Sequence, residues 1–275
     1  MAATGTPRSS PIMVTLAELR RCVAREYGRI LAPPWETPAI LLTNATVMVL
    51  AWFLLPARAH AFLFSLNGPL AFPIILASWM LADTPATNVM GANTSTALSV
   101  VEDRSAYWHW LVARCVVLGS LVGVPSAVAL IIVGAGGYTW LEISWAAVIV
   151  LVLPVGILPI AAWLGILFPY HPRSLRWRWQ HRRAWRMNLR WAALVLAPFA
   201  YVPVIGGLIL FPAVVVAKTL QVSGQWLTDV QFAVAATVAC ATMGIAAALG
   251  IAGARVLLRV RHDRLAAYLS SSAFG

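Results

Sequence analysis

Six long runs of apolar residues dominate this sequence and limit what it can fold into. They lie at about 39–56, 61–82, 107–134, 143–168, 191–217 and 230–258. A helix needs about 20 apolar residues to cross a bilayer, and the runs have about that length or more. Every backbone polar group must be paired inside a membrane, so runs of this kind span it as helices. The sequence therefore predicts an all-α, polytopic membrane protein with six transmembrane helices.

The composition leaves little room for a water-soluble domain. Hydrophobic residues make up 61% of the chain and charged residues 11%, whereas a soluble domain has roughly 45 to 50% and about 25%. We therefore divide the chain into three parts. Residues 1–37 form a disordered start and a cytoplasmic interfacial helix, 38–260 form the six-helix transmembrane domain, and 261–275 form a cytoplasmic tail.

The segment before the first run has the pattern of an amphipathic helix. Apolar residues recur every three or four positions between Thr15 and Leu31, and arginines occupy the rest of the surface. Thr15 and Glu18 match a capping box at the start, and Pro33 and Pro34 follow the end. Such a helix is too charged to span, and its Arg-rich face suits the inner surface of the membrane. A solvated helix packed on a partner protein is the alternative.

The distribution of basic residues predicts the orientation. With a cytoplasmic N-terminus, 18 of the 20 basic residues lie on the inner side, and the outer loops keep only Arg58 and Lys218. Cytoplasmic loops of membrane proteins carry such an excess of positive charge. We therefore expect both termini inside. The net charge of +11 then indicates contact with anionic lipids rather than with nucleic acid, for which no motif is present.

Two of the runs contain residues that alter helix geometry or packing. The fifth holds three prolines and two glycines, which predict kinks or a broken, partly re-entrant segment: Pro198, Pro203, Gly206, Gly207 and Pro212. The sixth holds small residues that let helices approach closely: Gly244, Ala248, Gly250, Gly253 and Ala254. These could form a dimer seam, although membrane helices are rich in Gly and Ala in any case.

The sequence contains no motif for catalysis. No predicted span has a charge near its middle, where a proton relay would need one. Phosphate-loop, HExxH and GxSxG motifs are missing, and the histidines and cysteines lack the spacing of a metal site. We therefore expect no catalytic residue, metal or cofactor in this chain.

The polar segments on the predicted cytoplasmic side are the remaining functional candidates. The loop at 83–106 can form a short helix from Thr96 to Arg104 that carries Glu102 and Asp103, or it can be an ordinary surface loop. The loop at 167–191 alternates arginine with tryptophan. That mixture fits contact with lipid headgroups, and docking of an acidic partner is the alternative.

Two segments of these loops resemble a known family. The sequence WMLADTPATNVMGAN, from Trp79 to Asn93, follows the second predicted span, and GILFPYHPRSLRWRW, from Gly165 to Trp179, ends the fourth. Both resemble ABC transporter permeases of the exporter class called type 2, in particular actinobacterial members. The six-span layout and the preceding interfacial helix agree with that resemblance, which extends over about residues 14 to 260.

The resemblance implies a transmembrane subunit in the bacterial plasma membrane that pairs with a second permease chain, identical or not, and with a separate ATPase subunit. In that family a coupling helix between spans 2 and 3 docks on the ATPase, and the interfacial helix contributes to the same surface. The corresponding residues here form a candidate ATPase-coupling surface: Arg20, Arg21, Arg25, Asp83, Asn88, Glu102, Asp103 and Arg104. Family members also have short re-entrant helices before the last span, for which this chain would have to use residues near 203–219.

Three functional hypotheses follow. The first is a permease subunit that exports an amphipathic or lipophilic substrate, such as a drug, a lipid or a lipid-linked metabolite. Because it lacks a phosphate loop, ATP hydrolysis would take place in the partner. The second is a membrane anchor or assembly factor that recruits a cytoplasmic protein without transport. A membrane-embedded enzyme is the third, and the missing acid, base, nucleophile and metal candidates argue against it.

Overall fold

The computed structural model describes residues 11–33, 35–58, 70–91, 94–102, 104–171, 175–180, 183–221 and 227–271. Every regular element in these ranges is a helix, which confirms the all-α prediction. Five helices are long and apolar enough to cross a membrane, as expected for a multi-pass membrane protein. They are α2 (Glu36–Leu54), α7 (Arg104–Gly134), α8 (Trp140–Leu167), α10 (Trp185–Leu220) and α11 (Asp229–Ser270).

These five helices match five of the six predicted runs to within a few residues, except that α10 begins six residues before its run and α11 extends twelve past its own. The second run, 61–82, is described only in its last part, where α4 (Ala71–Leu81) has 11 residues. A helix of that length is too short to cross a bilayer by itself. The rest of the run lies outside the described residues, so the sixth span stays a prediction.

Four further helices complete the described fold. They are α1 (Pro11–Ile30), α5 (Thr84–Thr87), α6 (Thr94–Glu102) and α9 (Leu175–Gln180). The first begins at Pro11, so the capping box at Thr15 was the wrong start: Thr15 lies inside the helix. Proline is well suited to the first position of a helix because it has no N–H to leave unpaired there.

The helix α8 is the centre of the bundle. It is the most buried of the five long helices and packs against α4, α7, α10 and α11. Its contact with α11 is close because α11 presents glycines: a Cβ at Gly250 would lie 2.7 Å from the Cβ of Pro159, and one at Gly253 would overlap the ring of Trp163. Small residues of the sixth run therefore serve packing within the chain.

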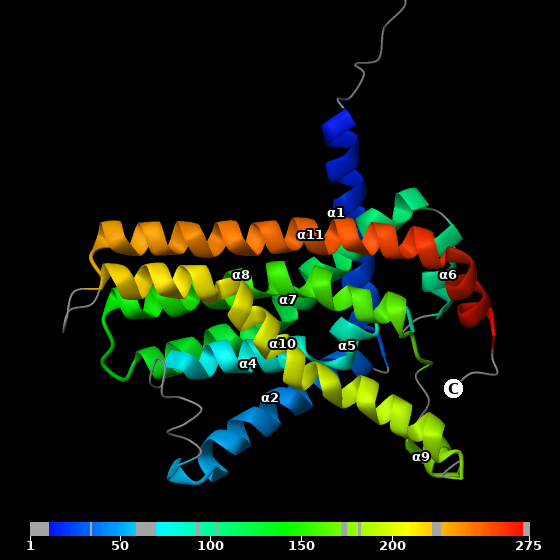
Figure 1. Ribbon diagram of the computed structural model, residues 1–275, viewed down its shortest axis with the longest axis horizontal. Helices are drawn as coiled ribbons and strands as arrows, with labels where there is room; N and C mark the ends of the chain where they lie inside the picture. The colour runs from blue at the N-terminus through cyan, green and yellow to red at the C-terminus, as the bar shows by residue number, and fades with distance from the viewer. Residues whose placement is uncertain are drawn as a thin grey trace, which may run out of the picture.

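The helix α10 is continuous from Trp185 to Leu220 although it contains Pro198, Pro203 and Pro212. Figure 1 shows that it bends: one half runs beside α11 and the other diverges toward α9. The predicted kinking is therefore present, whereas no separate re-entrant helix occupies residues 203–219. Proline removes single backbone hydrogen bonds, which bends a helix whose remaining turns stay paired.

The helix α11 has 42 residues, about 63 Å at 1.5 Å per residue, and so exceeds a hydrocarbon core of about 30 Å. The boundary placed between residues 260 and 261 falls inside it. Its last turns pack on α6, where Leu265 and Leu269 are buried in a cluster with Ala97 and Val101. This end of the bundle therefore has its own apolar core.

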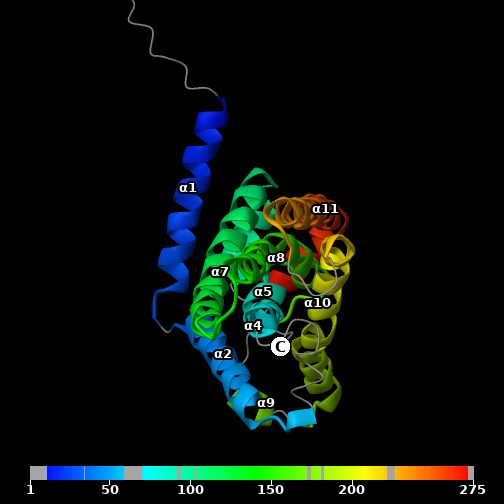
Figure 2. The ribbon, with the colours of Figure 1, turned by 90° about the vertical axis from the view of Figure 1, so that its left-hand side faces the viewer.

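The helix α1 lies across the bundle instead of along it. Figures 1 and 2 show it beside α7, nearly perpendicular to the long helices and near the end that holds α5 and α6. Val23, Tyr27 and Ile30 pack against the bundle. This placement is the one that a helix lying in the membrane surface would have, although its position at such a surface stays a prediction.

Candidate functional site: a buried polar junction

The turn between α4 and α5 is built by its own sequence. Asp83 caps α5: its side chain accepts a hydrogen bond of 2.6 Å from the backbone N–H of Thr84. Pro85 follows within the first turn, where its fixed φ favours a helix. The hydroxyl of Thr87 donates to the Asp83 carbonyl at 3.1 Å. The segment DTPATN therefore folds into a compact turn that can hold polar groups in place.

Asp83 joins this turn to the first long helix. Its carboxylate also accepts a hydrogen bond from the side-chain amide of Asn44, on α2, and only 4% of Asp83 is exposed. Burial raises the pKa of the Asp83 carboxyl above its usual value, while the hydrogen bonds from Thr84 and Asn44 act in the opposite direction. The carboxyl group is therefore held by two elements and shielded from water.

Asn88, at the other end of α5, joins the turn to the segment that follows α8. Its amide donates to the Tyr170 carbonyl at 2.8 Å, and the Tyr170 N–H donates back to the Asn88 side-chain oxygen at 3.3 Å. Two glycines permit this approach, since a Cβ at Gly91 would overlap the Tyr170 carbonyl and one at Gly165 would lie 2.7 Å from the Val89 nitrogen. The Asn88 side chain thus pairs with both backbone polar groups of Tyr170, as the backbone of a neighbouring strand would.

The third connection is an ion pair between the transverse helix α1 and the long helix α7. Nη1 of Arg114 lies 3.3 Å from a carboxylate oxygen of Glu26, and Nη2 donates to the Pro85 carbonyl at 2.9 Å. Arg29 also binds Glu26, through its Nε at 2.9 Å. Only 2% of Arg114 and 5% of Glu26 are exposed. Two charges buried so deeply are tolerated because each is paired and hydrogen-bonded.

We call this set the polar junction: Glu26, Asn44, Asp83, Pro85, Asn88, Arg114 and Tyr170. It connects α1, α2, α5, α7 and the segment after α8 through side chains that are mostly buried. No group of three or more His, Cys, Asp and Glu residues could hold a metal ion in the part of the chain that the structure describes. The arrangement is suited to transmitting a displacement of α1 to the long helices.

The structure brings two of the sequence-predicted site residues into the junction, Asp83 and Asn88, and both are buried. Arg20, Arg21 and Arg25 are exposed on α1 instead. The predicted short helix at 96–104 corresponds to α6, which ends at Glu102, with α7 beginning at Arg104. Asp103 lies outside the described residues, as do the side chains of its two neighbours. The predicted surface residues are thus divided between an exposed helix face and the interior.

Sequence reasoning missed Glu26 and Arg114 as a pair. A signal for Glu26 was present, because it occupies the same face of α1 as Val23 and Ile30, at spacings of three and four residues. A carboxylate in an apolar stripe requires a buried partner. Arg114 was counted as an inner positive charge, yet it lies ten residues inside α7. Its partner is 88 positions away in the sequence, so the pattern of neither helix alone indicates the other.

Comparison of this chain with protein-family models, with curated proteins and with solved structures gives no match. Functional inference therefore depends on the junction, on the span pattern and on the sequence resemblance.

Proposed function

We propose that this protein is the transmembrane permease subunit of an ATP-driven transporter of the ABC exporter class, with ATP hydrolysis in a separate subunit. The polar junction is the observation that carries this proposal. It links α1, on which Arg20, Arg21 and Arg25 are exposed, to α2, α7 and the end of α8 through buried hydrogen bonds and an ion pair. A subunit driven from outside the membrane needs such a mechanical connection.

In this proposal, the exposed face of α1 and the helix α6 contact the ATPase. Arg20, Arg21 and Arg25 supply positive charge on that face, and α6 packs beside the end of α11. Nucleotide-bound and nucleotide-free ATPase would bind two permease conformations with different affinities, and this difference is the energy that shifts the permease between them. The junction carries the displacement from α1 to the spans.

The spans favour an amphipathic or lipophilic substrate over a small ion. Long helices with few charges offer apolar surface, and a pathway for ions would need charged or carbonyl-lined sites. A drug, a lipid or a lipid-linked metabolite fits this chemistry, and export is the direction that the resemblance implies. In the same proposal, two permease chains in a bacterial plasma membrane share the pathway.

Site-directed photo-cross-linking in native membranes tests this proposal. A photoreactive phenylalanine replaces Arg21, on the exposed face of α1. In a control variant the same photoreactive residue replaces Val230, which is 74% exposed at the start of α11, the end away from α6. The proposal predicts an adduct between the Arg21 variant and a protein with a phosphate loop, and none from the control. An adduct with a protein that lacks nucleotide-binding motifs would favour the non-transporting anchor and contradict the proposal.

A further inference from the structure

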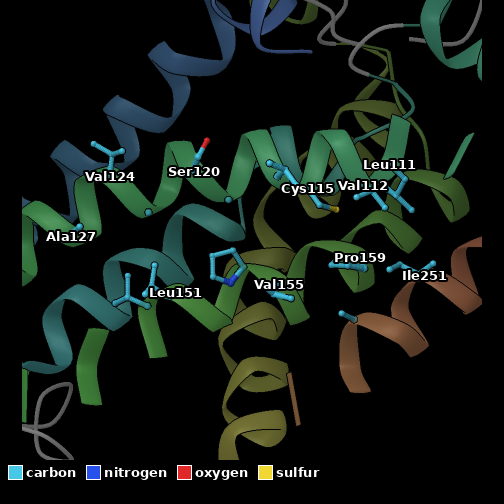
Figure 3. Close-up of a pocket in the computed structure, with 16 residues that line it drawn as sticks. Leu111, Val112, Cys115, Ser120, Val124, Ala127, Leu151, Val155, Pro159 and Ile251 are labelled. Carbon is cyan, nitrogen blue, oxygen red and sulfur yellow. The ribbon is translucent and has the colours of Figure 1, made fainter. Parts of the chain in front are cut away.

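An apolar groove runs between three of the long helices. Its volume is about 580 Å³, which is within the roughly 300 to 1,000 Å³ of ligand pockets in proteins. The floor is formed by α8, with Val150, Pro154 and Pro159, and the walls come from α7 and α11. Figure 3 shows labelled side chains of all three helices around this space. We call it the α7–α8–α11 groove.

The lining of the groove is almost entirely apolar. Its lining includes one hydroxyl, that of Ser120, which donates to the Val117 carbonyl and is hydrogen-bonded to the Tyr27 hydroxyl. The remaining lining is aliphatic apart from the thiol of Cys115. Along α7 the groove extends from Leu111 to Ala127, about 24 Å at 1.5 Å per residue. One leaflet of a bilayer core is about 15 Å thick, so an acyl chain fits along it.

A cation lies next to one end of the groove. Ile251 of α11 and Val112 of α7 line that end, and Arg255 and Trp108 follow them one helical turn further out. The guanidinium of Arg255 stacks on the Trp108 ring, 4.4 Å from its centroid, and bridges the two walls. Arg255 is exposed. A basic site between transmembrane helices at headgroup depth is typical of binding sites for anionic lipids.

From these observations we infer that the α7–α8–α11 groove binds an anionic phospholipid of the membrane, with an acyl chain in the groove and the phosphate at Arg255. The stacked indole orients the guanidinium, and the apolar lining of the groove favours an acyl chain over a polar molecule. This site is separate from the polar junction and does not depend on the ATPase. It would fix the spacing of α7 and α11, both of which pack on α8.

Glycines provide variants that fill the groove without disturbing the backbone. A Cβ at Gly123, in the α7 wall, would meet no atom within 4 Å, so Gly123→Leu extends into the open space. Gly207 has equally open surroundings on α10, outside the groove, and Gly207→Leu is the matched control. Leucine is a better helix former than glycine, so neither change weakens its helix. For the headgroup, Arg255→Gln is compared with Arg259→Gln, one turn further along α11.

Native mass spectrometry of the full chain, titrated with dioleoyl phosphatidylglycerol or with dioleoyl phosphatidylcholine, tests the inference. The wild type should bind the first phosphatidylglycerol in preference to phosphatidylcholine. Arg255→Gln should reduce the preference for phosphatidylglycerol about fivefold, whereas Arg259→Gln should leave the preference unchanged. Gly123→Leu should abolish binding of the first lipid of either kind. Inorganic phosphate should not displace the lipid, because it lacks the chain.

Several results would overturn the inference. One is equal lipid binding by Gly123→Leu and Gly207→Leu. Another is a phosphatidylglycerol preference that Arg255→Gln leaves unchanged. A third is a change of oligomeric state in Gly123→Leu without loss of lipid, since that would assign the groove to a second copy of the chain. None of these outcomes bears on the ATPase proposal, which is tested separately.

Discussion

At the scale of single residues, the Glu26–Arg114 pair is the most consequential feature of the molecule. Removing two charges from water costs several kcal/mol for each ion, and their attraction offsets this cost only with good geometry and additional hydrogen bonds. Arg29 and the Pro85 carbonyl supply those bonds. Replacing one member of the pair should therefore lower stability, and the intact pair fixes the position of α1 on α7.

Removing one member of the pair should be costly. Glu26→Gln leaves the buried Arg114 without its charged partner, and we expect it to lower the free energy of unfolding by about 3 to 5 kcal/mol. Arg114→Met should lower it by less, because Arg29 still pairs with Glu26. The double variant should recover part of the loss. Arg25→Gln, on the exposed face of the same helix, is the control and should change stability by about 0.5 kcal/mol or less. Thermal unfolding in detergent measures all four, and additive losses would contradict a direct pair.

Asp83 predicts a pH dependence. Burial raises the pKa of its carboxyl above 3.8 in the folded protein, so the folded state binds the proton more tightly than the unfolded chain does. The stabilisation from this group is present below pH 3.8 and is lost as the pH rises through the raised pKa. The melting temperature of the wild type relative to Asp83→Asn should therefore fall as the pH rises. A relative increase would mean that the hydrogen bonds from Asn44 and Thr84 outweigh burial.

At the scale of elements, the contact of α11 with α8 depends on the absence of side chains. Gly250 lies against the backbone of α8, and its carbonyl accepts a hydrogen bond of 2.6 Å from the indole N–H of Trp163. A Cβ at Gly156, on α8, would overlap the side-chain sulfur of Met243, on α11. In a membrane, where lipid is as apolar as leucine, close packing and such hydrogen bonds supply the association energy.

Enlarging one of these glycines should separate the two helices. A Cβ at Gly250 would lie 3.0 Å from the backbone nitrogen of Ile160, so Gly250→Leu must displace backbone and should lower stability by about 1 to 3 kcal/mol or more. Gly244→Leu, on the same helix with no atom within 4 Å of its Cβ, should be neutral. Melting temperatures compare the two, and an equal effect would contradict the role of Gly250 in packing.

Much of the element pattern could be predicted from sequence because long apolar runs have one stable form in a bilayer. The start of α1 could not, since Thr15 and Glu18 fit a capping box equally well inside a helix that began earlier at Pro11. Similarly, the glycines of α11 indicated close packing but not the partner: Gly250 and Gly253 contact α8 of the same chain. Local patterns specify which face packs, and tertiary contacts determine against what.

At the scale of the whole molecule, the arginine-rich segments gather at one end of the bundle. Figure 1 shows the start of α7, the helices α6 and α9 and the end of α11 on the same side, with the α7–α8 connection, the end of α10 and the start of α11 at the other. The helix α1, which carries Arg20, Arg21, Arg25 and Arg29, crosses the bundle nearer to the arginine-rich end. This segregation agrees with the orientation expected from the basic residues, in which that end faces the cytoplasm.

Cysteine labelling tests the orientation. In a variant with Cys22, Cys115 and Cys240 replaced by serine, single cysteines are placed at Thr219 and Ser270, which are exposed at opposite ends of the bundle. With both termini inside, a membrane-impermeant maleimide should label the Thr219→Cys variant in intact cells. It should label the Ser270→Cys variant only after permeabilisation. The reverse pattern would contradict the predicted orientation.

Only part of the polar junction could be predicted from the sequence. Asp83 and Asn88 could be singled out because they lie in the segment from Trp79 to Asn93 that resembles the ABC permeases. Their partners Asn44 and Tyr170 are 39 and 82 positions away. Neither the single polar residue Asn44 in an apolar run nor the backbone of Tyr170 indicates from sequence which side chain it will bind. The segment was therefore interpreted as a surface, whereas folding buries it under α2 and the end of α8.

Co-purification is the sharpest test of the proposal that this chain is the membrane subunit of an ATP-driven transporter. The tagged full chain is isolated from native membranes in mild detergent, its partners are identified by mass spectrometry, and ATP hydrolysis is measured in the eluate. We expect a stoichiometric subunit with a phosphate loop to co-purify, and we expect Glu26→Gln to alter ATP hydrolysis without releasing that subunit. An intact, folded chain with no nucleotide-hydrolysing partner would contradict the proposal.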